Sequence, residues 1–262
     1  MNSKSIPTEY EHLSWPEVKN IASRKGSTII WPFGAIEQHG PHLPLATDGI
    51  FVDEIVNEVL KLIPGDIPIK KFPTQYLGFS PEHLGFSGTI TLSSTLLINL
   101  IVEVGQQLSN MGFQRLILIN GHGGQVSLLN TAARELKKNA SDLSIFPCFL
   151  WSGVEGISDL ISQSELENGL HASLAETSLM LKLKPYLVGE ERPFELINSK
   201  IPKGWSLEGD APVAWSTKDI SNSGVIGDSR GANEELGNDL KKLLINHWYN
   251  LLLSLMSSDW PK

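Results

Sequence analysis

Two short apolar runs in this chain each end in a glycine-rich loop, and each loop leads into a helical pattern of apolar residues. The runs are Ser27–Trp31 and Arg115–Ile119, and both have the length and composition of buried strands. Asp48 stands where the first helix should begin, and its apolar stripe continues to Ile63 before Pro64. Strands that alternate with helices predict βαβ units, a mainly parallel sheet and the α/β class.

The alternation continues along the chain. We expect two further strands, at Ile67–Phe72 and Leu143–Leu150. We also expect four further helices, one capped by Ser93 or Ser94 with an apolar face from Leu96 to Leu108, and the others at about Val126–Lys138, His171–Leu183 and Ala232–Met256. The segment Leu187–Arg230 is rich in Gly, Pro, Ser and Asn and predicts no regular structure. No repeat or linker interrupts the 262 residues, so we expect one domain spanning 1–262.

Charge and composition exclude several classes of partner. A net charge of -8 and the absence of a Lys/Arg cluster argue against nucleic-acid binding. No run reaches the roughly 18 apolar residues of a membrane span, and residues 1–18 lack the apolar core of a signal peptide. The single cysteine, Cys148, fits a reducing compartment. We therefore expect a cytoplasmic protein that acts on a small-molecule substrate, with no membrane partner.

The loops after the two apolar runs concentrate residues that bind metals. The first loop and the helix start that follows it carry Glu37, His39 and Asp48, and the second loop carries His122 between glycines. Carboxylates and imidazoles are ligands of borderline and hard divalent cations. Loops at the carboxyl ends of parallel strands open on one edge of the sheet, so these side chains are expected to converge.

A third segment, His171–Ser178, adds His171 and Glu176. The carboxylates and imidazoles of the three segments are sufficient for two cations about 3.5 to 4 Å apart, and the proposed ligands are Glu37, His39, Asp48, His122 and Glu176. Such a pair polarises a carbonyl and activates a water, which is the chemistry of amide C–N hydrolysis. Zn, Mn and Fe all suit this ligand set.

Each of these residues also has a structural interpretation. Asp48 can be a helix N-cap, Glu37 a solvated carboxylate and His39 part of the loop packing. Four candidate ligands in two loops, both after predicted strands, favour the metal site over that coincidence. Glu82 and His83, in another loop, are further candidates to reach the pocket.

Three motifs resemble the creatininase family of creatinine amidohydrolase-like proteins. They are PFGAIEQHGPHLPLATD at Pro32–Asp48, NGHGG at Asn120–Gly124 and HASLAETS at His171–Ser178. The resemblance spans about Trp15 to Met256 and implies a three-layer α/β/α sandwich with a two-metal site. It also implies a homo-oligomer, usually a hexamer.

The resemblance assigns roles by motif position. Glu37, His39, Asp48 and His122 are expected ligands with Asp48 as the bridge, and His171 matches a proton-transferring histidine. Creatininase has a glutamate two residues after the histidine matched by His122, where this chain has Gly124. We take Glu176 as the replacement, so that His171 and Glu176 are the expected catalytic residues. The expected substrate-facing tryptophans, with a core or interface role left open, are Trp151, Trp205 and Trp215.

We therefore predict a creatininase-like amidohydrolase, a hydrolase of carbon–nitrogen bonds other than peptide bonds, which cleaves a cyclic amide or formamide with a metal-activated water. Members with the glycine-rich second loop include enzymes that act on formamides and others that act on peptides. Two alternatives stay open. One is a metal-dependent isomerase or lyase acting on a carbonyl substrate, and the other is a non-catalytic metal-binding scaffold.

Overall fold

A computed structural model of the chain describes residues 8–195, 201–202, 204–209 and 211–260. Its main sheet has four strands, β1 (Thr28–Phe33), β2 (Ile69–Lys71), β3 (Arg115–Asn120) and β4 (Ser144–Phe149), in the order β2-β1-β3-β4. All three strand pairings are parallel. The predicted α/β class and parallel sheet are confirmed.

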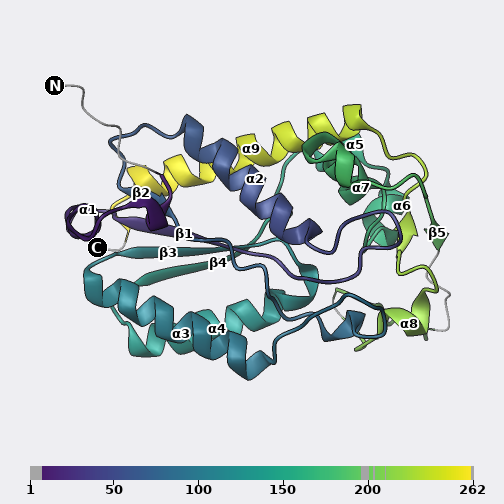
Figure 1. Cartoon of the computed structure of the whole chain (residues 1–262), viewed down its shortest axis with the longest axis horizontal. Helices are drawn as coiled ribbons and strands as arrows, with labels where there is room; N and C mark the ends of the chain where they lie inside the picture. The colour runs from purple at the N-terminus through teal and green to yellow at the C-terminus, as the bar shows by residue number, and fades with distance from the viewer. Residues whose placement is uncertain (1–7, 196–200, 203, 210, 261–262) are drawn as a thin grey trace.

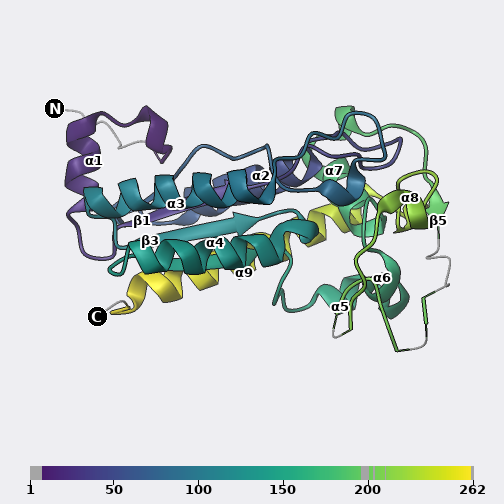
Figure 2. The same cartoon turned by 90° about the horizontal axis from the view of Figure 1, so that it is seen from below.

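Helices cover both faces of this sheet (Figure 1). On one face lie α2 (Thr47–Leu62), α7 (Leu174–Leu183) and α9 (Glu234–Ser257). On the other lie α3 (Ser94–Met111) and α4 (Val126–Asn139), which Figure 2 shows side by side along the sheet. The expected three-layer sandwich is therefore the observed architecture.

Alternate residues of the strands supply the two cores between these layers. In β3, Ile117 and Ile119 pack in the core formed with α2 and α9, whereas Leu116 and Leu118 pack in the core formed with α3 and α4. All four side chains are buried, as the two-residue period of a strand covered on both faces requires.

The remaining elements lie at the ends of the sandwich. They are η1 (Tyr10–His12), α1 (Trp15–Ala22), η2 (Pro81–His83), η3 (Gly123–Gln125), α5 (Ile157–Leu160), α6 (Gln163–Asn168), η4 (Pro185–Leu187), β5 (Phe194–Glu195), α8 (Thr217–Ile220) and β6 (Gly227–Asp228). β5 and β6 form an antiparallel pair, so the prediction of no regular structure over Leu187–Arg230 is wrong in part. Pairing between two strands so distant in sequence leaves no local pattern to detect.

The helix expected from His171 begins three residues later, at Leu174. His171 pairs instead as extended backbone with Ile226, and Ala172 has a φ of 52°, in the left-handed region. A non-glycine residue in that region cannot continue a right-handed helix. His171 therefore lies in a bend before the helix and not in the helix itself.

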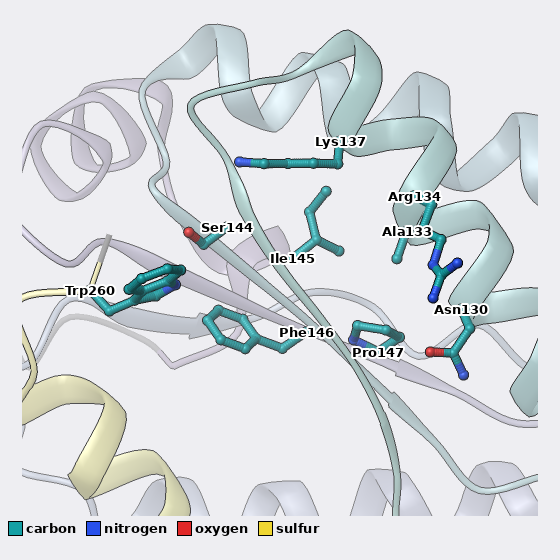
Figure 3. Close-up of a pocket in the computed structure, with 9 residues that line it drawn as sticks. All are labelled: Asn130, Ala133, Arg134, Lys137, Ser144, Ile145, Phe146, Pro147 and Trp260. Carbon is teal, nitrogen blue, oxygen red and sulfur yellow. The ribbon is translucent and has the colours of Figure 1, made fainter. Parts of the chain in front are cut away.

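The outer edge of β4 borders a cavity of about 330 Å³ (Figure 3). The figure shows side chains of α4 on one side of it, those of β4 on the other, and Trp260 at one end.

Among the described helices none is long and apolar enough to cross a membrane. The prediction that residues 1–18 form no signal peptide falls partly on residues 1–7, which lie outside the described ranges.

Candidate metal centre

The candidate residues converge at the carboxyl ends of β1 and β3. Glu37 and His39 lie in the loop after β1, and His122 follows β3, which pairs with β1 along its whole length. Asp48 lies in the first turn of α2 and Glu176 in the first turn of α7. The three sequence segments are therefore brought to one edge of the sheet, where open α/β sheets form their sites.

The carboxylate of Asp48 lies between two imidazoles. Its Oδ1 is 3.3 Å from His39 Nε2, and its Oδ2 is 3.5 Å from His122 Nδ1. Both oxygens are thus directed at nitrogens that come from different loops. This is the arrangement in which one carboxylate can serve two neighbouring cations.

Glu37 is a fully buried carboxylate without a hydrogen bond from the described residues. Its side chain is 0% exposed, and neither oxygen has a hydrogen-bond partner. Nitrogens of His122, His83 and His171 lie 3.1, 3.4 and 3.8 Å from its Oε1. A buried carboxylate so poorly satisfied costs free energy unless a cation is bound to it. The site therefore fits a divalent cation.

Other subsets of these side chains also approach metal-binding geometry. Candidate ligand atoms lie within 4.8 Å of one another in three groups: Glu37, His39 and Asp48; His39, His171 and Glu176; and Glu37, His83 and His171. Glu176 thus lies beside His39 and His171. Its Oε2 accepts a hydrogen bond from the Ala172 backbone N–H at 2.6 Å, across the bend described above.

Gln38 sets the protonated nitrogens of two stacked histidines. Its Oε1 accepts from the Gly40 N–H, which leaves Nε2 to donate to the Gly224 carbonyl and to His83 Nδ1. His83 Nδ1 also accepts from the Thr217 hydroxyl at 2.7 Å, so its proton is on Nε2. His171 Nε2 donates to the Gln38 carbonyl at 2.7 Å, so its Nδ1 carries the lone pair toward the cluster.

Burial and mutual charge shift the pKa values of the cluster. Burial raises the pKa of Glu37. Burial alone would lower the pKa of His39, but the carboxylate of Asp48 raises it to about 9. Burial also raises the pKa of Glu176 to about 7, against the opposing effect of His39. Burial and the charge of His39 hold the pKa of His171 well below its ordinary value.

A cavity of about 1190 Å³ opens over the cluster. The residues that line it include Glu37, Asp48, His122, His171 and Glu176, together with Trp151 and Trp215. The described residues that line it include no lysine or arginine.

Trp205 is the one of the three candidate tryptophans that is not among the lining residues, and it is 58% exposed. Glu82 and His83 both reach the cavity through η2. Glu208 also lines it and was not predicted, because nothing in its local sequence distinguishes it from a solvated loop carboxylate.

Comparisons with known proteins point to one family. The sequence profile described as creatininase, creatinine amidohydrolase, matches residues 11–252. The chain is 31% identical to the mycofactocin precursor peptide peptidase of Mycobacterium tuberculosis, over 80% of this chain and 78% of that protein. It is 27% identical to the creatinine amidohydrolase of Pseudomonas putida, over 69% of this chain and 73% of that protein. A solved structure described as manganese creatininase superposes with a TM-score of 0.79 at 22% identity, over 97% of this chain and 100% of that one.

Proposed function

The chain belongs to the creatininase family, and on that premise we propose that it is a metal-dependent hydrolase that cleaves an amide C–N bond. The observation that carries the proposal is the position of Asp48. Its two oxygens face His39 and His122 at 3.3 and 3.5 Å, beside the buried and unsatisfied carboxylate of Glu37. Burying this many ionisable groups together is costly unless a bound cation compensates for it.

We propose two divalent cations, Zn, Mn or Fe, as the bound metals. Their ligands would be Glu37, His39, Asp48, His122 and Glu176, with Asp48 as the bridge. The manganese in the superposed creatininase supports a divalent cation in this fold. When bound, the cations supply a Lewis acid that polarises a carbonyl and lowers the pKa of a coordinated water.

The chain's own residues would orient the substrate and move the proton. We assign His171 as the proton carrier, because its Nδ1 is unprotonated and faces the cluster while its Nε2 is held by the Gln38 carbonyl. Nδ1 can accept a proton from the attacking water and deliver it to the leaving nitrogen of the amide. Glu176, in the first turn of α7 and hydrogen-bonded to the bend through the Ala172 N–H, contributes a catalytic carboxylate.

For the substrate we propose a cyclic amide or a formamide. A short peptide is the second candidate, because the relative from Mycobacterium tuberculosis is named a peptidase of a precursor peptide. The cavity of about 1190 Å³ also favours it, since sites for drug-sized ligands are usually about 300 to 1,000 Å³.

The test combines metal content with turnover on protein purified without chelator. Elemental mass spectrometry should find two cations per chain in the wild type, a lower content in Glu176→Ala and none in Asp48→Ala. Turnover of a panel of lactams, formamides and short peptides should follow metal content. Arg134→Ala, far from the site in the β4 cavity, is the control. Full metal content and turnover in Asp48→Ala would refute the bridging role.

Labelled water separates the two alternative functions from hydrolysis. A hydrolase incorporates one oxygen from solvent into the acid product, whereas an isomerase or lyase incorporates none in net. A scaffold would bind the cations and turn over no member of the panel. The intact set of Glu37, His39, Asp48, His122 and His171 supports catalysis over the scaffold.

Three further proposals concern the whole protein. We propose a single creatininase-like domain over 1–262, because the family profile covers 11–252 without a break. We propose a cytoplasmic homo-oligomer, a hexamer in the manner of the family. Its mass in solution, measured by light scattering, tests the assembly.

A further inference from the structure

The two ring nitrogens of His122 face different partners. Nδ1 lies 3.1 Å from Glu37 Oε1 and 3.5 Å from Asp48 Oδ2, inside the cluster. Nε2 lies 3.0 Å from Glu82 Oε1, within ion-pair distance, although the two groups are not aligned as a hydrogen bond. A histidine that binds a metal through one nitrogen usually donates its other N–H to a carboxylate, a carbonyl or water. Glu82 stands where such a carboxylate belongs.

Glu82 occupies the space that a side chain at position 124 would need. A Cβ added to Gly124 would lie 1.8 Å from Glu82 Oε1 and 2.6 Å from His122 Nε2. A Cβ added to the adjacent Gly123 would meet only Glu208 Oε1, at 3.8 Å. The two glycines are therefore not equivalent, because only position 124 must lack a side chain for the carboxylate to reach His122.

The segment that carries Glu82 is held in place. Glu82 is the middle residue of η2, and the next residue, His83, is buried and accepts hydrogen bonds from Thr217 and Gln38 at 2.7 and 2.8 Å. The Glu82 side chain itself is only 13% exposed. A carboxylate on such a fixed turn loses little entropy when it pairs with His122.

We propose that Glu82 is the positioning residue of His122, and that glycine is required at position 124 to admit its carboxylate. Glu82 pairs with the Nε2 side of the ring at 3.0 Å and favours the tautomer whose Nδ1 lone pair is directed at Glu37 and Asp48. The inference rests on the proposed function in one respect, which is that His122 binds a cation. It assigns Glu82 no contact with substrate and no metal ligation.

The experiment measures metal affinity by competition with a chromophoric chelator, using Zn²⁺ and Mn²⁺ separately. Glu82→Ala should weaken binding about 10- to 100-fold, the usual effect of losing such a partner. Glu82→Gln keeps an acceptor oxygen and should recover most of the affinity. Glu208→Ala, which removes a neighbouring carboxylate from the same cavity, is the control and should stay within about twofold. Circular dichroism of the metal-free variants checks their folding.

The glycine pair supplies the second arm. Gly124→Ala should reproduce the loss seen in Glu82→Ala, whereas Gly123→Ala should bind as tightly as the wild type. In the Glu82→Ala background, Gly124→Ala should cost less than in the wild type, because the contact with the carboxylate is already gone and only the 2.6 Å contact with His122 Nε2 remains.

The outcomes separate this inference from the proposed function. Wild-type protein that binds neither cation would refute the proposed metal centre itself. Wild-type binding that Glu82→Ala leaves unchanged, or equal affinities for Gly123→Ala and Gly124→Ala, would overturn the role of Glu82 while the metal centre stands. An equal cost of Gly124→Ala in both backgrounds would overturn the link between the two positions.

Discussion

Two cavities of the described chain differ in the charge of the residues that line them. The cavity at the carboxyl ends of β1 and β3 is lined by carboxylates and histidines, and the cavity at the edge of β4 by Arg134 and Lys137 without a carboxylate. Lys137 already donates to the Leu143 carbonyl at 2.9 Å, whereas both oxygens of Glu37 are buried and accept no hydrogen bond from the described residues. The comparison indicates that a buried charge without a hydrogen bond identifies a ligand-binding site better than the presence of a cavity does.

The largest effect should come from removing the unsatisfied charge. Glu37→Gln should lose bound metal and lower turnover by more than about 10⁴-fold, equivalent to about 5 kcal/mol. The metal-free variant should unfold at the same temperature as metal-free wild type or higher, because it no longer buries a carboxylate that accepts no hydrogen bond from the described residues. Elemental analysis, turnover and thermal unfolding in chelator measure the three quantities. A large fall in metal-free stability would show that Glu37 supports the fold instead.

His171→Gln should separate metal binding from turnover. We expect turnover to fall about 10²- to 10³-fold, the usual contribution of a proton-transferring group. Metal content should remain that of the wild type, because in our assignment Nδ1 of His171 transfers a proton and does not bind a cation. The same preparation is assayed for both quantities. If the variant loses one cation, His171 is a metal ligand instead. The short distances among ligand atoms of His39, His171 and Glu176 are compatible with that role as well.

Metal affinity should rise with pH in the carboxylate-lined cavity. In the metal-free protein the pKa of His39 is raised to about 9, so between pH 6 and 8 a proton occupies the nitrogen that the cation needs. Each unit of pH then changes affinity about tenfold, so binding should tighten about 100-fold from pH 6 to 8. Glu176, with its pKa raised to about 7, should add to the loss below pH 7. Chelator competition at pH 6, 7 and 8 measures the slope, and a flat profile would contradict it.

The smallest effect should come from the β4 cavity. The double variant Arg134→Ala, Lys137→Ala should keep metal content and turnover within about twofold of wild type, since surface substitutions usually act weakly. Thermal unfolding should show a loss of about 1 kcal/mol, because Lys137 gives up its hydrogen bond to Leu143. A substantial change in turnover would mean that the two cavities communicate.

Local patterns in the sequence were sufficient for the layers and for most of the site. One apolar run is followed by the loop that carries Glu37, and the other by the loop that carries His122. Because neighbouring parallel strands end at the same edge of the sheet, this order predicts that the two side chains lie close together. The same patterns missed the bend at His171, where pairing with Ile226 overrides the helical periodicity that follows it. Glu208 stayed hidden for a related reason: its place in the cavity depends on the path of a long loop, which no local signal encodes.

The hydrogen bonds of Gln38 give the site a direction. His83 presents an N–H toward Glu37, and the neighbouring His171, whose ring stacks on it at 4.2 Å, presents a bare nitrogen. An amide has the matching pair of groups, a carbonyl that accepts and a nitrogen that must gain a proton as it leaves. One residue, Gln38, thereby makes the two faces of the site unequal, through its side-chain amide at His83 and its backbone carbonyl at His171. A bound amide turned end for end would meet donor with donor and acceptor with acceptor.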